Sequence, residues 1–386
     1  MSWHPTGEVI VDKRGTSLIL SGRFNIGLNM IKKLIGPVSR GDVVIVKDEN
    51  GEFLGEGFYE EIGSVGVRML TFKDRISLDL IDERMKNALD MRKRMKLGNY
   101  FRLVHSESDL LPGLIIDFYN DIASITSTSV GFDARIKDIA NILIKLGARA
   151  VFARNDSRTR RQIDLPLWKG KIAGEGPSDT IIDEEGVLFH VDVLKGQKTG
   201  FFIDQRINRI SLRRYISKGD NVLDLFSYTG GFGLHAAVEG ANVTAVDESD
   251  YAEEEIVRNA ELNKVKINFI KRNVKELKIE GEYDVVIADP PALIPSIDRK
   301  DAGKKAYLTL NTKIMNIVRK GGFIFTFSCS QFLSQEELKG IVIKAGDKSG
   351  RNIKLLNGVL GQSPDHPVDP KHPWTGYLKG FIVNCT

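Results

Sequence analysis

Two short segments in the last third of the chain carry side chains suited to covalent chemistry. Cys329 lies two residues after the apolar run Phe323–Phe327, and Asp289, followed by two prolines, comes directly after another apolar run. A thiolate is a strong nucleophile, and a carboxyl group can protonate or hydrogen-bond a ring nitrogen. Addition of a thiolate to carbon 6 of cytosine gives carbon 5 the reactivity of an enamine carbon, which can take a methyl group. The pair therefore predicts covalent catalysis on a pyrimidine, with Cys329 as nucleophile and Asp289 as its partner at the base.

The two cysteines of the chain receive different interpretations. A free cysteine is more often a small buried apolar residue than a nucleophile. Cys329 lies between Ser328 and Ser330 at the end of an expected strand, which favours the catalytic interpretation, whereas Cys385 is expected to be an ordinary core residue. Two cysteines cannot build a disulfide framework, and no cysteine or histidine spacing predicts zinc, so no metal site is expected.

A glycine-containing turn predicts the cofactor site. Glycines in the segment Asp224–Gly233 let the backbone approach a ligand closely. Asp224 could meet a cationic amino group, Asp247 could accept both hydrogen bonds of a ribose diol, and Asn273 could contact an adenine amino group. The segment Gly231–Ala236 also fits the dinucleotide pattern G-x-G-x-x-A, but the negative charge of Asp224 would repel a pyrophosphate. The turn therefore favours S-adenosylmethionine (AdoMet) over a nicotinamide cofactor.

Alternating strands and helices must position these residues. From about residue 200 the chain predicts a doubly wound, mostly parallel sheet with its ligand site at the carboxyl ends of the strands. The expected strands are 221–226, 243–247, 267–270, 283–288 and 323–327, and the expected helices are 231–239, 250–263, 304–319 and 334–346.

The preceding residues predict two further domains. Residues 1–72 have the pattern of a small β-barrel, with β segments that include 17–21 and an Asn50-Gly51 hairpin turn. Residues 73–195 predict a central α+β domain, and residues 196–386 form the expected Rossmann-like domain. The central domain is expected to contain a basic helix at 75–97, strands at 114–118 and 122–126, a helix at 132–146 ended by Gly147, and strands near 149–153 and 187–193.

Composition sets broad limits on the class of protein. With 386 residues, 42% hydrophobic and 27% charged, the chain is typical of a globular protein of two or three domains. The net charge of +4 does not by itself predict a nucleic-acid partner. Basic residues gather at 84–102, 154–161 and 206–214, and each cluster is either a solvated surface or a phosphate-binding patch. No signal peptide and no membrane-length apolar run is recognisable, so we expect a cytoplasmic protein.

Ordered motifs along almost the whole chain resemble the RlmI-type 23S ribosomal RNA 5-methylcytosine methyltransferases and their archaeal relatives. These motifs are Leu110–Asp117, Lys198–Arg206, Phe226–Phe232, Asp289–Pro291, Thr326–Ser330, Asp365–Pro367 and Tyr377–Phe381.

The resemblance implies an α/β protein with an N-terminal PUA β-barrel domain, a central α+β domain and a C-terminal class I methyltransferase domain. It also implies AdoMet as methyl donor, large-subunit ribosomal RNA as substrate, and pairing as a homodimer. Cys329 and Asp289 would be catalytic. Residues at the cofactor would be Lys198, Thr199, Gln205, Arg206, Asp224, Phe226, Tyr228, Gly230, Gly231, Asp247, Asn273 and Asp289, and residues at the substrate would be Pro290, Pro291 and Ser328.

Three other functions share part of these features. A methyltransferase acting on a guanine nitrogen would share the glycine turn and the Asp-Pro-Pro motif but would need no nucleophile, so dependence on Cys329 separates it from the first hypothesis. An RNA-binding or ribosome-assembly factor could retain AdoMet affinity without turnover. A nicotinamide oxidoreductase would bind reduced nicotinamide cofactor.

Overall fold

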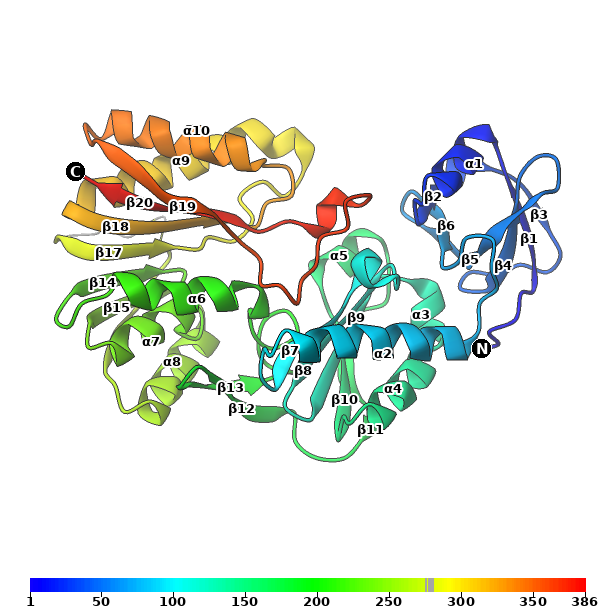
Figure 1. Ribbon diagram of the computed structural model, residues 1–386, viewed down its shortest axis with the longest axis horizontal. Coiled ribbons are helices and arrows are strands. Elements are labelled where there is room, and N and C mark those ends of the chain that lie inside the picture. Colours follow the sequence, from blue (N-terminus) through cyan, green and yellow to red (C-terminus); the bar gives the residue numbers. More distant parts are fainter. Residues whose placement is uncertain (275, 277–280) are drawn as a thin grey trace. The chain divides into compact units, whose positions relative to one another are not determined.

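The computed structural model describes residues 1–274, 276 and 281–386 (Figure 1). Contacts within the chain divide it into two compact units. The first comprises residues 1–180, 191–203 and 364–375, and the second comprises residues 181–190, 204–363 and 376–386. The chain thus passes between the units several times, and the three-domain division at residues 72 and 195 stays a prediction.

The first unit begins with a six-stranded sheet in the order β2-β6-β5-β4-β1-β3. The expected hairpin turn joins β4 to β5, and it is confirmed: Gly51 has a φ of 88°, and its amide donates to the Asp48 carbonyl at 3.1 Å. Only glycine adopts this backbone conformation without strain. The strands are β1 (Gly7–Val11), β2 (Asn25–Gly27), β3 (Ile31–Ile35), β4 (Val43–Lys47), β5 (Phe53–Ile62) and β6 (Val65–Met69).

The β segment expected at residues 17–21 is wrong, because residues 17–20 belong to helix α1 (Lys13–Leu20) and Ser21 is its C-cap. The Asp12 carboxylate accepts a hydrogen bond from the Gly15 amide at 2.8 Å and so caps the helix. The buried residues of α1 are Gly15 and Ile19, and their spacing of four places both on one face of a helix, whereas Leu20 is 64% exposed. A local cap and one-sided burial therefore outweigh the β propensity of the run.

The remainder of the first unit is a five-stranded sheet in the order β11-β10-β9-β8-β7. The basic helix expected at 75–97 is α2 (Leu78–Arg94), and the helix expected at 132–146 is broken at Arg135 into α3 (Val130–Ala134) and α4 (Ile136–Lys145). Gly147, with a φ of 109°, follows the end of α4 as expected. The strands are β7 (Tyr100–His105), β8 (Leu114–Tyr119), β9 (Ile122–Ser127), β10 (Ala150–Asn155) and β11 (Trp168–Gly174); β7 and β11 were not among the expected strands.

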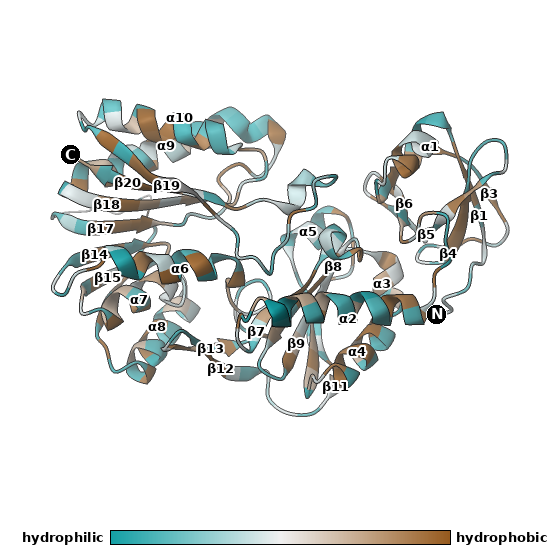
Figure 2. Cartoon of the chain, in the orientation of Figure 1, coloured by the Kyte–Doolittle hydropathy of each residue, from teal (hydrophilic) through white to brown (hydrophobic). Residues whose placement is uncertain are grey.

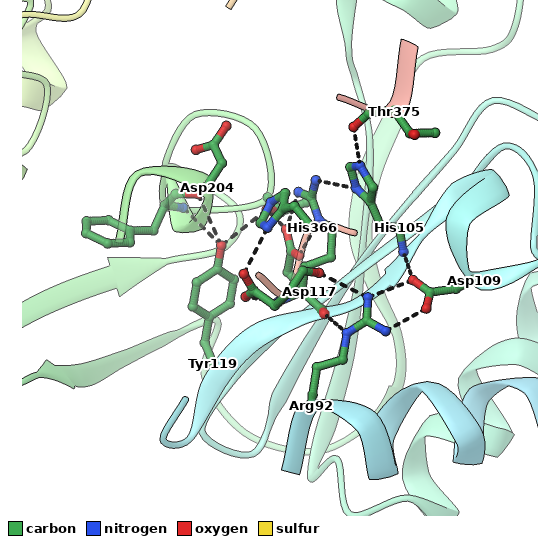
Figure 3. Close-up of polar contacts among 12 residues, drawn as sticks. Arg92, His105, Asp109, Asp117, Tyr119, Asp204, His366 and Thr375 are labelled. Carbon is green, nitrogen blue, oxygen red and sulfur yellow. Dashed lines mark hydrogen bonds and ion pairs between the residues drawn. The ribbon is translucent and has the colours of Figure 1, made fainter. Parts of the chain in front are cut away.

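Several arginines of the basic clusters serve the interior of the first unit. Arg92 donates two hydrogen bonds to the Asp109 carboxylate, at 2.5 and 2.7 Å (Figure 3). Arg102 holds Asp117 in the same two-pronged way, at 2.8 and 2.9 Å. These guanidinium groups are buried, so they stabilise the fold and cannot form part of a surface for phosphate. Lys93, Arg94, Arg158 and Arg161 remain exposed.

The second unit is built on a seven-stranded sheet in the order β16-β15-β14-β17-β18-β20-β19. The first five of these strands are parallel to one another, and β20 runs antiparallel to both of its neighbours, which confirms the mostly parallel α/β architecture. The antiparallel pair at the C-terminal end was not foreseen. The strands are β14 (Asn221–Leu225), β15 (Asn242–Asp247), β16 (Ile267–Lys271), β17 (Tyr283–Ala288), β18 (Val318–Ser328), β19 (Ile353–Gly361) and β20 (Lys379–Cys385).

Helices pack on both faces of this sheet. Alternate strand residues point to opposite faces, and the apolar residues (brown on the ribbon in Figure 2) belong to two separate clusters. One cluster includes α6 (Arg206–Leu212) and α7 (Gly231–Val238), and the other includes α9 (Lys300–Ile317) and α10 (Gln335–Lys348). Helix α8 (Asp250–Leu262) connects β15 to β16. Because both faces are covered, the edge formed by the strand ends is left as the place for a ligand site.

A short hairpin, β12 (Asp179–Glu184) and β13 (Val187–Asp192), brings a buried carboxylate into the second unit. Glu184 accepts hydrogen bonds from Arg209 at 2.6 and 2.7 Å and from His235 at 2.8 Å. Arg209 lies on α6 and His235 on α7, so this one carboxylate joins the hairpin to two helices.

Within the described ranges, no helix has the length and apolar character needed to cross a membrane.

Candidate active site

The turn between β14 and α7 has the backbone of a ligand-binding loop. Phe226 and Tyr228 have positive φ values of 61° and 48°, which side-chain-bearing residues seldom adopt. Gly230, with a φ of 83°, is the N-cap of α7, and a Cβ there would lie 2.7 Å from Ile256. The next residue, Gly231, would place a Cβ 3.0 Å from Arg209. These constraints bring the chain tightly from the strand into the helix and direct backbone amides toward the sheet edge.

Two acidic residues flank this turn. Asp224 lies on β14, not inside the turn as expected, and its buried carboxylate accepts a hydrogen bond from the Gly233 amide at 2.8 Å. Burial, together with the negative charges of Asp289 and Asp247, raises the pKa of Asp224 to about 7. Asp247 ends β15 and accepts hydrogen bonds from the amides of Tyr228 at 2.9 Å and Ser249 at 3.0 Å. One backbone amide thus orients each oxygen of Asp247, and their remaining lone pairs can accept hydroxyl groups.

The other expected cofactor residues of the second unit lie on different elements. Asn273 follows β16, and its amide nitrogen donates to Glu248 at 2.7 Å. Gln205 precedes α6 and accepts a hydrogen bond from Asn208 at 2.6 Å, whereas its own side-chain nitrogen is buried without a partner among the described residues. Arg206 is buried with its Nε 4.0 Å from Glu184.

Lys198 and Thr199 belong to the first unit. The Lys198 ammonium lies over the Phe202 ring, 4.2 Å from its centroid. Thr199 is buried and donates a hydrogen bond to Asp117 at 2.5 Å, and the Tyr119 hydroxyl lies 3.2 Å from its oxygen. The Thr199 hydroxyl is therefore fixed by the β8 strand of its own unit, and its role at a cofactor stays a prediction.

The two expected catalytic residues leave the sheet at the same edge. Strands β17 and β18 are parallel neighbours, and Ala288 pairs with Thr326. Asp289 follows β17 directly, and Cys329 follows β18 directly. Cys329 is partly exposed as a residue, and its sulfur lies 3.9 Å from the carbonyl oxygen of Pro290. The loop after Asp289 and the loop that begins at Cys329 (the nucleophile loop, residues 329–333) are therefore in contact, with the Cys329 thiol at that contact.

A buried group of hydroxyls supports this contact. The Tyr307 hydroxyl, from α9, accepts a hydrogen bond from Ser328 at 2.8 Å and lies 2.9 Å from the Ser330 hydroxyl. Ser330 also accepts a hydrogen bond from the Ile294 amide at 3.2 Å. Ser328 is fully buried, and its expected contact with substrate stays a prediction. Pro290 is buried and Pro291 is exposed, so only Pro291 of the two presents its ring to solvent.

Two polar residues near Cys329 were missed as individual functional residues. Tyr307 lies within a helix and carries no sequence signal of its own. Lys379 occurs in a motif of the resemblance, but a lysine at the start of the apolar strand β20 gives no indication that its ammonium reaches the nucleophile loop.

Comparison with known proteins agrees with this geometry. A family model described as an S-adenosylmethionine-dependent methyltransferase matches residues 167–321, and one described as a PUA-like domain matches residues 9–72. A Methanocaldococcus jannaschii protein named as a ribosomal RNA large subunit methyltransferase is 36% identical, over 98% of this chain and 99% of its own length. Ribosomal RNA large subunit methyltransferase I of Alteromonas mediterranea is 34% identical, over 92% of this chain and 93% of its own. The chain belongs to this methyltransferase family.

Solved structures show the same fold. A SAM-dependent methyltransferase from Streptococcus mutans superposes with a TM-score of 0.80 at 20% identity, covering 98% of this chain and 99% of its own. A methyltransferase structure in complex with SAH (S-adenosylhomocysteine) gives a TM-score of 0.81 at the same 20% identity, again covering 98% of this chain and 99% of its own. Together with the two family models, these superpositions confirm the expected PUA-like and Rossmann-like methyltransferase domains.

As a member of this family the chain is an AdoMet-dependent methyltransferase, and its β14–α7 turn suits such a ligand. The side-chain oxygens of Ser227 and Thr229 are buried in the turn and have no hydrogen-bond partner among the described residues. Polar groups of this kind are costly unless a ligand or water satisfies them. The residues present thus fit a polar cofactor at the carboxyl edge of the sheet.

Proposed function

We propose that this enzyme methylates carbon 5 of cytosine in RNA, in particular large-subunit ribosomal RNA, through a covalent adduct of Cys329. The observation that carries the proposal is the partly exposed residue Cys329 at the strand edge that also presents Asp289, with its sulfur 3.9 Å from the Pro290 carbonyl oxygen. A nitrogen-directed methyltransferase has no use for a nucleophile there, because nitrogen already offers a lone pair. The names of the relatives support ribosomal RNA as the substrate.

The chemistry divides between the two residues. The Cys329 thiolate adds to carbon 6 of a base that has been flipped out of its stack, and a carbon–sulfur bond forms. Asp289 donates a hydrogen bond or proton at N3 and so neutralises the charge that develops there. AdoMet, when bound, supplies the methyl group that carbon 5 takes up. A base then removes the proton of carbon 5, the carbon–sulfur bond breaks, and Cys329 leaves as thiolate.

The cofactor residues follow from the β14–α7 turn. We assign Asp247 to the ribose hydroxyls and Asp224 to the cationic amino group, with the turn residues Phe226–Gly231 forming the floor of the pocket. Asn273 is assigned to the adenine, and Lys198, Thr199, Gln205 and Arg206 are assigned to the pocket by the family motif that contains them.

The assignment of Asp224 predicts a pH dependence of AdoMet binding. Because the pKa of Asp224 is raised to about 7, the carboxyl is largely protonated below neutral pH, and a neighbouring cation favours the ionised form. Binding is therefore coupled to proton release, and affinity should rise with pH up to about 7. Isothermal titration calorimetry is expected to give a Kd roughly tenfold higher at one pH unit below the pKa than at one pH unit above it. In Asp224→Asn this dependence should vanish; if it persists, another group is responsible.

The product nucleoside tests the proposed reaction. Unmodified ribosomal RNA is incubated with the enzyme and AdoMet, digested to nucleosides and analysed by mass spectrometry. The expected product is 5-methylcytidine. A methylated guanosine would replace the proposal with a nitrogen-directed enzyme, and AdoMet binding without methyl incorporation would indicate an assembly factor.

We further propose that the enzyme acts in the cytoplasm and pairs as a homodimer. Light scattering coupled to size-exclusion chromatography checks the second statement, since the 43.0 kDa chain should then elute with twice its mass.

A further inference from the structure

Lys379 contacts the nucleophile loop from the neighbouring strand. It begins β20 and pairs with Ser328, the last residue of β18. Its side chain is only 8% exposed, and its Nζ donates hydrogen bonds to the carbonyl oxygens of Ser330 and Leu333, both at 2.7 Å. One ammonium therefore holds both ends of the loop segment that directly follows Cys329.

The surroundings of this ammonium contain little compensating charge. Both acceptors of its Nζ are neutral carbonyls, and a buried cation is costly unless an anion accompanies it. Burial lowers the pKa of Lys379, whereas the negative charges of Cys329 and Glu337 raise it. Glu337 is already paired with Lys300 at 2.9 Å and Lys304 at 2.7 Å. Besides Glu337, the negative charge that acts on Lys379 is that of Cys329.

Three ionisable groups on the neighbouring elements are acidic or neutral. Asp289, after β17, is acidic, and Glu337, on α10, is the partner of two lysines. Tyr307, on α9, is a neutral hydroxyl, because burial raises its pKa. Lys300 and Lys304 are bonded to Glu337, whereas the Lys379 ammonium is bonded to the loop that begins at Cys329.

We propose that Lys379 is a positioning residue for the nucleophile: it fixes the 329–333 loop by two carbonyls and stabilises the Cys329 thiolate with its charge. The inference rests on the proposed role of Cys329. This role accounts for both the carbonyl contacts and the buried charge of Lys379. The nearby ammonium favours the ionised form of the thiol, and the two carbonyl bonds fix the loop that carries it.

Alkylation of the folded protein by iodoacetamide, followed by peptide mass spectrometry, tests this without RNA or AdoMet. Cys329 should react and Cys385 should not, because Cys385 is fully buried and burial raises its pKa to about 11. In Lys379→Met the Cys329 rate at pH 7 should fall about tenfold, and the midpoint of its pH profile should move upward by about one unit. Lys379→Arg, which keeps the charge, should restore most of the rate.

Tyr307→Phe is the matched control, because it removes hydrogen bonds from the same loop and leaves every charge in place. Its pH midpoint should equal that of the wild type. An unchanged midpoint in Lys379→Met, or an equal shift in Tyr307→Phe, overturns the proposal. If Lys379→Met does not fold, the wild-type profile decides: a midpoint clearly below the value of about 8.5 for free cysteine supports the proposal, and one at or above it overturns it. Failure of the cytosine reaction itself would appear only in the product nucleoside.

Discussion

Replacing Cys329 with alanine is expected to abolish 5-methylcytidine formation, with kcat/KM falling by about 10³-fold or more. The loss is large because carbon 5 of cytosine becomes a nucleophile only after the thiolate adds to carbon 6, so no partial reaction remains. Cys329 is partly exposed at a strand end, and its loss should change the free energy of unfolding little. The measurement is single-turnover methyl transfer from radiolabelled AdoMet, with AdoMet affinity determined in parallel.

The second cysteine provides the control for this experiment. Cys385→Ala removes a thiol of the same chemistry from the buried end of β20, so it should lower stability and leave methyl transfer per folded molecule unchanged. RNA containing 5-fluorocytidine should form a stable adduct with the wild type, because fluorine cannot leave as the proton does. That adduct should be absent in Cys329→Ala. Methylation by Cys329→Ala at a near-normal rate would contradict the covalent mechanism.

Replacing Glu184 with glutamine is expected to cost about 3–5 kcal/mol in the free energy of unfolding, measured by denaturant titration. Glu184 is fully buried and is bonded to Arg209 at 2.6 and 2.7 Å and to His235 at 2.8 Å. Glutamine keeps the size of the side chain but removes the charge, which leaves the Arg209 guanidinium buried without its anion. The hairpin β12–β13 would then lose its attachment to α6 and α7.

Glu185 is the matched control for this substitution. It is the next residue along the chain and is exposed at the hairpin turn, so Glu185→Gln should change the free energy of unfolding by less than about 0.5 kcal/mol. The Arg209 guanidinium and the His235 contact hold the pKa of Glu184 well below its usual value despite its burial. Its stabilising contribution is therefore complete above the ordinary carboxyl range near 4.5 and is lost as the pH falls toward the lowered pKa. Equal stabilities of the two variants at pH 7 would contradict this account.

Local patterns were sufficient for much of the fold. The alternation of strands and helices after residue 200, the Asn50-Gly51 turn and the stop at Gly147 are all present, because each depends on residues close together in the sequence. The expectation failed at 17–21, where the Asp12 cap and one-sided burial made a helix of an apolar run. It also failed for β19 and β20, whose antiparallel pairing is decided by partners far away in the chain.

For the candidate site, the sequence by itself determined that Asp247, Asp289 and Cys329 close or follow apolar runs, whereas Asp224, expected in the turn, lies within its strand. Parallel strands present their carboxyl ends at one edge, so proximity followed from the pattern alone. Only the tertiary structure decided how these residues are supported. Lys379 lies 50 positions from Cys329 in the sequence, and its Nζ holds the Ser330 carbonyl at 2.7 Å; Tyr307, Ser328 and Ser330 share hydroxyl contacts from two elements. Such contacts depend on how distant segments pack. The periodicity of apolar residues indicates only which face of an element is buried, so it carries no information about these contacts.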